Sequence, residues 1–338
     1  MDWNFMQIGF HLTPFWSPTD RSPTQIIDEA IEVVRAASTM GYAWVSMGQH
    51  WLTYPTIWPQ PYPLIARLAP ETGNMQIKSS VLLLPLLNPV EVAENVSTLD
   101  HMTHGRLVLG VAIGYREAEL ETAGLSRKDR TAKLEESIEL MKQLWTGQEV
   151  TFEGRYSKVT KGRVGFTPYQ KPHPPIEMGA QSEGATRRAA RLADGVFFGP
   201  QVAWADIQKL AKVYREARAE AGHGGPGTVG ASRSLMVAKS KEDAARTARQ
   251  YLDKTFNMYQ TWEMQEKSMV SLQLGHEHDL DDWTIHGSPK DCVEMLERAC
   301  ETTGMDRVGF TIYSLPRDPQ ARIDYLQMIA EEIVQKVL

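Results

Sequence analysis

The sequence of 338 residues is 42% hydrophobic and 23% charged, a composition typical of a globular protein that excludes a disordered chain. Its formal net charge is −6, from 36 basic and 42 acidic side chains, and it has no long basic run, so nucleic acid is not an expected partner. No apolar run reaches the ~18 residues of a membrane span and no signal sequence is recognisable, so we expect a cytoplasmic protein that does not enter the membrane.

The chain alternates short apolar runs with amphipathic runs of helical period. In the first half, strands are predicted at residues 6–11, 42–47, 77–84 and 106–111, and helices at 22–40, 89–101 and around 134–145. Ser22 followed by Pro23 predicts a capped helix start, and Gly41 a helix end. The run from Ile77 to Leu84, which is apolar apart from residues 78–80, is typical of a parallel strand buried on both faces.

The second half continues the alternation after an excursion at residues 149–158, which is predicted to be a hairpin. Strands are predicted at 174–179, 194–199, 232–238 and 308–313, and helices at 185–192, 204–220, 241–253, 289–303 and from 318 to the end. Residues 254–287 are predicted to be less regular; their aromatic and methionine side chains suit either a lid or a surface helix. The histidines and acidic residues at 276–282 match no trusted ligand spacing, and no metal site is predicted.

Eight β–α repeats predict an α/β protein with a (β/α)₈ barrel, that is, a TIM barrel. We expect a single domain spanning residues 1–338, with insertions after strands four and seven. The alternative is an open, doubly wound sheet. It is less favoured because His11-Leu12-Thr13-Pro14, rather than a G-x-G-x-x-G turn, ends the first strand.

In such a barrel, chemistry belongs to the loops after the strands. The loop after strand two, residues 48–63, contains four aromatic side chains and four prolines, and therefore predicts a stiff wall for a planar ligand. His50 in this loop is a candidate catalytic acid–base group, because imidazole changes charge near neutral pH; the alternative is a hydrogen-bonding loop residue. Gln49, the preceding residue, is the second candidate catalytic residue. The predicted substrate pocket comprises His11, Trp51, Trp58 and Tyr62.

Two further loops are candidate anion sites. Gly114 and Tyr115 follow strand four, where glycine lets the backbone approach a ligand closely. Gln181, Ser182 and Gly184 follow strand five and lead into a helix, whose N-terminus favours an anion. Taken alone, close packing explains the first pattern equally well, and a plain serine cap explains the second.

Short motifs along nearly the whole chain resemble those of the bacterial-luciferase-like family of flavin-dependent oxidoreductases. They are LPLLNP at 84–89, LDHMTHGRL at 99–107, GVAIGY at 110–115, Arg130, LWTG at 144–147, PHPPI at 172–176, ADG at 193–195 and GSP at 287–289. The resemblance implies a (β/α)₈ barrel enzyme that binds FMN, or the deazaflavin F420, at the C-terminal ends of its strands.

The resemblance also implies roles for individual residues. A non-prolyl cis peptide is expected late in strand three, at Ser80–Val81, beneath the cofactor ring. The cofactor phosphate is expected at the loop after strand five and at backbone near strand four. This assigns cofactor binding to Ser80, Val81, Gly114, Tyr115, Gln181, Ser182 and Gly184.

The pair Gln49-His50 departs from the patterns of both branches of the family. Its monooxygenases often carry two adjacent histidines after strand two, and its F420 enzymes usually an acidic residue followed by histidine. His50 fits both patterns, whereas Gln49 fits neither, so the choice between FMN and F420 stays open.

Three functions are therefore expected, in this order. The first is a two-component monooxygenase, in which reduced FMN from a separate flavin reductase and O₂ act on a small organic substrate, with His50 moving the proton. The second is an F420-dependent dehydrogenase or reductase that transfers hydride. The third is a flavin-binding barrel without catalysis. A homodimer is expected from the resemblance.

Overall fold

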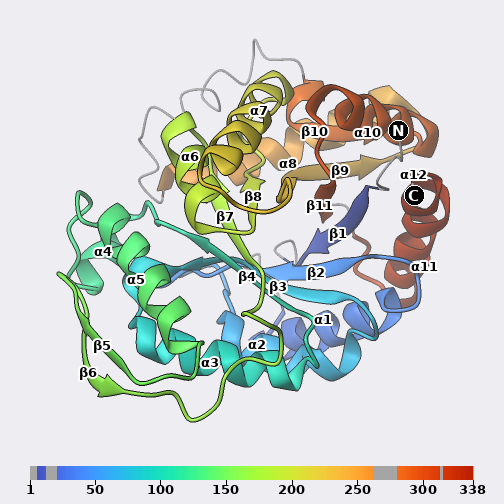
Figure 1. Ribbon diagram of the computed structural model, residues 1–338. Coiled ribbons are helices and arrows are strands. Elements are labelled where there is room, and N and C mark those ends of the chain that lie inside the picture. The colour runs from blue at the N-terminus through green and yellow to red at the C-terminus, as the bar shows by residue number, and fades with distance from the viewer. Residues whose placement is uncertain (1–5, 13–20, 262–279, 313–314, 338) are drawn as a thin grey trace.

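The core of the protein is a closed barrel of parallel strands surrounded by helices (Figure 1). The computed structural model describes residues 6–12, 21–261, 280–312 and 315–337. Its barrel strands are β1 (Gln7–His11), β2 (Trp44–Met47), β3 (Gln76–Leu83), β4 (Leu107–Ala112), β7 (Ile176–Ala180), β8 (Gly195–Phe198), β9 (Thr228–Val237) and β11 (Arg307–Ile312). They pair in this order, and β11 pairs with β1 to close the ring. The predicted (β/α)₈ barrel is therefore confirmed.

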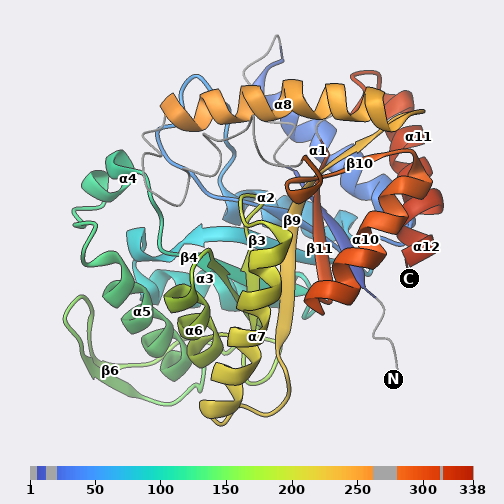
Figure 2. The same cartoon turned by 90° about the horizontal axis from the view of Figure 1, so that it is seen from above.

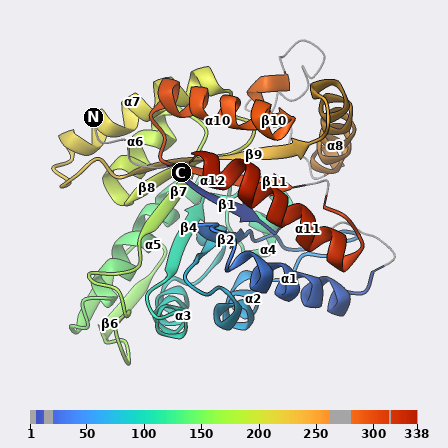
Figure 3. The ribbon, with the colours of Figure 1, turned by 90° about the vertical axis from the view of Figure 1, so that its right-hand side faces the viewer.

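The helices lie around the outside of the barrel (Figure 2). They are α1 (Pro23–Ala37), α2 (Pro61–Leu68), α3 (Pro89–Met102), α4 (Glu117–Thr122), α5 (Arg130–Leu144), α6 (Glu183–Leu192), α7 (Trp204–Glu220), α8 (Lys241–Thr261), α10 (Pro289–Thr303), α11 (Pro319–Ile329) and α12 (Gln335–Val337). In Figure 3, α1, α2 and α3 line up along one side of the barrel. Within the described ranges, no helix is both long and apolar enough to cross a membrane.

Local signals explain where the longer helices start and end. The Ser22 hydroxyl accepts the Gln25 backbone N–H before α1, and the Gln25 side chain accepts the Ser22 N–H in return. Ser288 and Asp291 form the same reciprocal pair before α10. Gly304 ends α10 with a φ of 63°, a left-handed conformation that glycine adopts without a Cβ clash.

Two insertions leave the β–α alternation. The predicted hairpin after strand four is present as antiparallel strands β5 (Val150–Glu153) and β6 (Lys158–Gly162). A short strand, β10 (Thr284–Gly287), lies in the connection after strand seven and pairs with the end of β9, beyond the residues of β9 that pair with β8. The expectation that residues 254–287 are irregular was therefore wrong at both ends, where α8 continues to Thr261 and β10 forms. Residues 262–279 lie outside the described ranges.

Two short helices, α2 and α4, were not predicted from the sequence. α2 begins within the proline-rich stretch, where Pro61 and Pro63 occupy the first turn, which needs no intrahelical N–H donors. α4 has six residues, of which three are glutamates, and is too short to show a helical pattern of apolar residues. Both helices follow loops at the C-terminal end of the barrel, and both therefore bear on the site described below.

The barrel interior is filled by large side chains that face glycines. Trp44 of β2 is fully buried. A Cβ at Gly9 would lie 2.1 Å from its Cδ2, and a Cβ at Gly309 would lie 2.3 Å from its Cη2. Likewise, a Cβ at Gly230 would lie 2.5 Å from Phe197 Cδ2. The strands that carry these glycines can therefore close the barrel only because they carry no side chain there.

A buried ion network lies beside these aromatic rings. Lys78 of β3 is fully buried, pairs with Glu177 of β7, and holds its ammonium 4.2 Å from the centre of the Trp44 ring. Arg307 Nη1 lies 2.8 Å from the other carboxylate oxygen of Glu177. Burial raises the pKa of the adjacent Asp306 to about 6. The buried charges are thus paired, as their desolvation requires.

Replacing Gly9 with alanine should destabilise the protein by about 3 kcal/mol, because the new methyl group overlaps the Trp44 indole. In a Trp44→Leu background the same substitution should cost less, giving a coupling of about 1–3 kcal/mol in a double-mutant cycle of urea denaturation. Gly165→Ala is the control, since a Cβ there meets no described atom within 4 Å. Strict additivity of the two changes would contradict the packing argument.

Candidate active site

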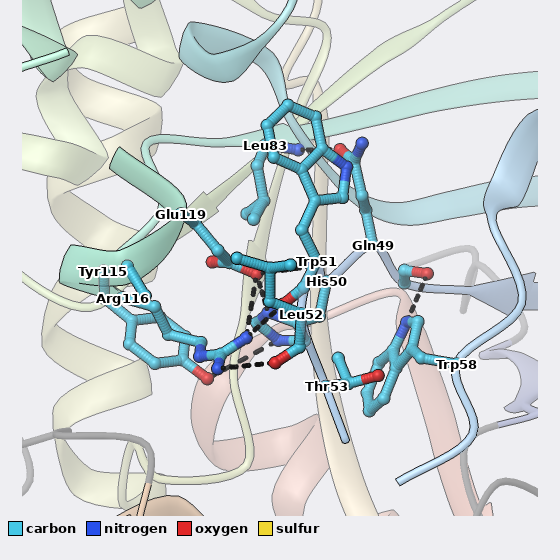
Figure 4. A network of polar contacts seen from close by, with 12 residues as sticks. Gln49, His50, Trp51, Leu52, Thr53, Trp58, Leu83, Tyr115, Arg116 and Glu119 are labelled. Atoms are coloured by element: carbon cyan, nitrogen blue, oxygen red, sulfur yellow. Dashed lines mark hydrogen bonds and ion pairs between the residues drawn. The ribbon is translucent and has the colours of Figure 1, made fainter. Parts of the chain in front are cut away.

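Side chains from the loops after β2 and β4 meet at the C-terminal end of the barrel (Figure 4). His50 Nδ1 lies 2.9 Å from an oxygen of Glu119 in α4, whose carboxylate is 1% exposed. A carboxylate at Nδ1 holds a proton on that nitrogen and leaves Nε2 as the acceptor. The Tyr115 hydroxyl lies 3.5 Å from Nε2, at the long limit of a hydrogen bond. His50 therefore has the geometry of an acid–base group with an orienting partner.

The backbone that carries His50 is held from α4 as well. Glu119 Oε1 accepts the Trp51 N–H at 2.8 Å, and Arg116 donates to the carbonyls of Trp51 and Leu52. The Gln60 side chain donates to the His50 carbonyl at 2.9 Å. These contacts fix the loop after β2 against the start of α4.

The Ser80–Val81 peptide bond is cis, as the family resemblance implied. The ladder between β3 and β4 is interrupted there, between Ser79 and Leu82. The Ser79 hydroxyl fills the gap by accepting the Gly110 N–H at 2.9 Å and donating to the Gly110 carbonyl at 3.0 Å. A Cβ at Gly110 would lie 2.0 Å from the Ser79 carbonyl oxygen, so only glycine permits this approach.

Gln49 braces the other side of the same peptide. Its backbone N–H donates to the Val81 carbonyl at 3.1 Å, and its side-chain Oε1 accepts the Leu83 N–H at 2.8 Å. With its side chain engaged in this way, Gln49 positions β3 beside His50. Its expected part in catalysis stays a prediction.

The aromatic side chains expected in a substrate pocket occupy three different places. Trp58 meets the His50 ring edge-on, with ring centres 4.9 Å apart, and its indole N–H donates to the Gly48 carbonyl. Trp51 is half-buried and packs against a small cluster of leucines from β3, the turn after it and α4. Tyr62 lies in α2, and burial, together with Glu91 of α3, raises the pKa of its hydroxyl. Two of the three aromatic residues thus lie at or beside His50.

The two candidate anion loops follow neighbouring strands. Val111 of β4 is paired with Met178 of β7, and three residues further on lie Gly114 and Gln181 respectively. Gly114 has a φ of 74°, in the left-handed region. Its carbonyl accepts from Arg130 at 2.8 Å, and the Tyr115 carbonyl accepts from Arg127 at 2.7 Å. The loop after β4 is therefore held in place by two cationic side chains.

The start of α6 is open. Ser182 caps the helix by accepting the Ala185 N–H at 3.4 Å, and Gln181, Ser182 and Gly184 are all exposed. A Cβ at Gly184 would meet none of the described atoms within 4 Å. Backbone N–H groups in the first turn of a helix lack intrahelical partners and carry its positive dipole end. The predicted residues after β7 thus form an accessible N-terminus beside the loop after β4.

His11, the fourth predicted pocket residue, is buried at the end of β1. Its Nδ1 bonds the Ser46 hydroxyl, and its ring meets Trp44 edge-on at 5.5 Å. Its Nε2 has no partner among the described residues and faces the backbone of Gly309, where a Cβ would lie 2.6 Å away. Burial, and then the charge of Lys78, lower the pKa of His11 to about 3, so the ring is neutral. The structure places His11 inside the barrel, apart from the contacts of His50.

Glu119 and Arg116 are residues of the site that the sequence reading missed. Both lie in or next to a segment dense in glutamate, which predicts a solvated surface, and Glu119 is 69 positions from His50. Their position directly after strand four, at the functional end of the barrel, is the one feature of the sequence that could have indicated a role in the site.

In the described ranges, no group of three or more histidine, cysteine, aspartate or glutamate side chains is arranged to hold a metal ion. The residues at 276–279 that were weighed as possible ligands lie outside those ranges.

A family model described as luciferase-like monooxygenase matches residues 6–307. Over 181 residues the chain is 34% identical to an F420-dependent glucose-6-phosphate dehydrogenase of Nakamurella multipartita, covering 51% of each chain. Over 248 residues it is 26% identical to the oxygenase component of a flavin-dependent trigonelline monooxygenase of Acinetobacter baylyi, covering 72% of this chain and 68% of that one. The chain thus spans about half the length of the first of these curated relatives.

Solved structures share the fold over the full length of the chain. The oxygenating constituent of 3,6-diketocamphane monooxygenase from Pseudomonas putida, in complex with FMN, superposes with a TM-score of 0.82 at 22% identity, covering 99% of both chains. An F420-dependent secondary alcohol dehydrogenase superposes with a TM-score of 0.76 at 18% identity, covering 97% of this chain and 99% of that one.

The depressed pKa of His11 predicts a pH dependence of stability. The unfolded chain takes up a proton near pH 6.5, whereas the folded chain does so only near pH 3, so the free energy of unfolding falls as the pH drops through this window. Between pH 6.5 and 5 the loss attributable to His11 should be about 2 kcal/mol. The free energy of unfolding is measured by urea denaturation at pH 7 and pH 5. In His11→Asn, whose amide can still bond Ser46, it should fall by about 2 kcal/mol less between these two pH values than in the wild type. Equal losses in both proteins would contradict the assignment.

Proposed function

The chain belongs to the luciferase-like monooxygenase family and is an oxidoreductase, and we propose that it is the oxygenase of a two-component system that uses reduced FMN and O₂ on a small organic substrate. The observation that carries this proposal is the buried pair of His50 and Glu119, placed beside the cis peptide at the C-terminal end of the barrel. In support, the trigonelline monooxygenase component matches 72% of the chain, whereas the F420-dependent dehydrogenase matches 51%.

The residues present fit a flavin-type cofactor. The exposed start of α6 has space above Gly184 and N–H groups suited to a phosphate, and Arg127 and Arg130 hold the neighbouring loop. Ser80 and Val81 are half-buried at the end of β3, where a ring would lie against backbone braced by Ser79 and Gln49. When bound, the reduced flavin supplies two electrons and activates O₂.

His50 performs the proton transfer in this proposal. Its Nδ1 is engaged by Glu119, so Nε2 is the atom that accepts a proton from, or returns it to, the substrate. Trp58 and Tyr115 flank the imidazole edge-on and limit the access of water to it. The rings of His50, Trp58 and Tyr115 form an aromatic wall, whose polar groups include the imidazole and the Tyr115 hydroxyl. Such a wall favours a neutral or planar organic substrate.

A second candidate function is hydride transfer with F420. It is favoured by the relative of highest identity given above, the 34% identical glucose-6-phosphate dehydrogenase. His50 would serve there as well, as the acid or base for a substrate hydroxyl, and no O₂ would be consumed. A separate reductase is a partner only in the first proposal; a homodimer is compatible with both.

Fluorescence titrations of the purified protein with photoreduced FMN and with F420 decide between these cofactors. The proposal expects binding of reduced FMN and little affinity for F420; the reverse result would move the protein to hydride transfer.

Gly184→Asp should raise the dissociation constant for FMN about tenfold, because the new carboxylate would lie beside the phosphate, yet leave the helix slightly more stable. Riboflavin, which lacks the phosphate, is the control and should bind both proteins equally.

Replacing His50 with asparagine should lower turnover about 10²-fold or more, because the amide keeps the contact with Glu119 but cannot move a proton. O₂ uptake is measured with NADH, a flavin reductase and a substrate panel that begins with trigonelline and 3,6-diketocamphane, the compounds named for the two relatives. His223→Asn, a change in a half-buried histidine that bonds the Arg191 carbonyl, is the control. Unchanged turnover in His50→Asn would remove the acid–base role.

A further inference from the structure

We propose that Arg116 is a positioning residue that sets the protonation state of His50 through Glu119. By neutralising the buried carboxylate, the guanidinium allows the imidazole to rest in its neutral form, with an Nε2 lone pair that can accept a proton. This inference rests on the acid–base role proposed above for His50, and it concerns a residue that contacts Glu119 and the backbone after His50.

The first step of the argument is that one oxygen of Glu119 serves three donors. Oε1 lies 2.9 Å from His50 Nδ1, 2.8 Å from the Trp51 N–H and 3.3 Å from Arg116 Nη1. The other oxygen, Oε2, is buried and has no hydrogen-bond partner in the described part of the chain. Among the described residues, every hydrogen-bond donor to this carboxylate therefore binds Oε1, and none binds Oε2.

The second step concerns charge. A carboxylate that is 1% exposed requires a cation nearby, because its ionised form is poorly solvated. In the described ranges, the side chains of His50 and Arg116 lie close enough to supply that charge. The guanidinium is a permanent cation, so with Arg116 in place the imidazole need not be protonated to compensate Glu119. Without it, the imidazolium would be the compensating cation and Nε2 would carry a proton.

The third step is that the same guanidinium fixes the loop. Arg116 donates to the carbonyls of Trp51 and Leu52, directly after His50 (Figure 4). Leu52 adopts a φ of 52°, a conformation that is uncommon for a residue with a side chain and that these contacts help to hold. One residue therefore sets both the charge at Nδ1 and the position of the backbone that carries the ring.

The groups that surround the imidazole come from several segments. Glu119 and Tyr115 contact its two nitrogens from the segment after β4, and Trp58 and Gln60 approach from its own loop without charge. Arg116 is the cation that acts on Glu119 itself. Among these described groups Arg116 and Glu119 carry the charges, so changes at positions 116 and 119 should alter the protonation of His50.

The experiment uses the full-length protein labelled with ¹⁵N-histidine. Imidazole ¹⁵N resonances are followed from pH 5 to pH 9 in the wild type, Arg116→Met and Arg116→Lys, with the His50 signals assigned by their loss in His50→Gln. Arg67→Met, which breaks an exposed ion pair with Glu71, is the matched control. Arg116→Gln, a neutral variant that can still donate to a loop carbonyl, replaces the methionine variant if that one fails to fold.

The wild type and Arg116→Lys should show neutral His50 with the proton on Nδ1 at pH 7.5, whereas Arg116→Met should show the imidazolium. In the double variant Arg116→Met/Glu119→Gln the ring should be neutral again, because the carboxylate is gone. An unchanged His50 state in Arg116→Met, or the imidazolium in Arg116→Lys, would overturn the proposal.

Turnover gives the second readout. In Arg116→Met the acidic limb of kcat against pH should move upward by about one pH unit, so that kcat near neutral pH falls about tenfold, and lysine should restore most of it. A purely structural role would lower kcat at every pH and leave the limb in place. If the wild type shows no turnover with FMN or F420, the proposed function fails, while the ¹⁵N experiment still decides the role of Arg116.

Discussion

The contact of the Trp44 indole with Gly9 and Gly309 is the constraint on which the rest of the structure depends. The ring occupies the barrel interior, and the neighbouring strands β1 and β11 pass beside it only because they lack a side chain at Gly9 and Gly309. Because β2 carries Trp44 and is followed directly by the loop of His50, one strand links the packing of the interior to the position of the proposed acid–base group. The ammonium of Lys78 lies over the face of the Trp44 ring, and the neutral His11 ring meets Trp44 edge-on.

Two buried carboxylates, Glu177 in the barrel and Glu119 at its mouth, both require cations and hydrogen-bond donors, but they are satisfied to different degrees. Glu177 divides its oxygens between Lys78 and Arg307, so it is fully compensated and serves the scaffold. Glu119 gathers a cation, an imidazole and a backbone amide on one oxygen, and its second oxygen stays unbonded within the described ranges. An incompletely satisfied buried group of this kind is typical of a functional site, whereas the complete network is typical of a structural core.

Much of the fold and part of the site could be predicted from the sequence, because their signals are local. The apolar end of β3 at residues 81–83, the Ser22 cap and the loop glycines each specify backbone by themselves, and the family motifs led to the cis bond at Ser80–Val81. What could not be predicted depends on contacts between distant residues. The glutamates of α4 are as charged as any solvated helix, and only the folded chain shows that Glu119 turns inward to His50 while its neighbours do not. Likewise, Tyr62 was expected at a pocket, but the helix that carries it became visible only in the structure.

The loop after β2 and the segment after β4 are tied together by Arg116 and Glu119, and the latter segment also contains Gly114 and Tyr115. The proposed proton-transfer group and the proposed cradle for the cofactor phosphate are therefore joined through six consecutive positions, from 114 to 119, rather than standing as independent parts. This matters for how such barrels diverge and how they are engineered. A loop after β2 taken from another barrel would arrive without the carboxylate and guanidinium that match it, so new substrate ranges should arise by exchange of the two loops as a unit.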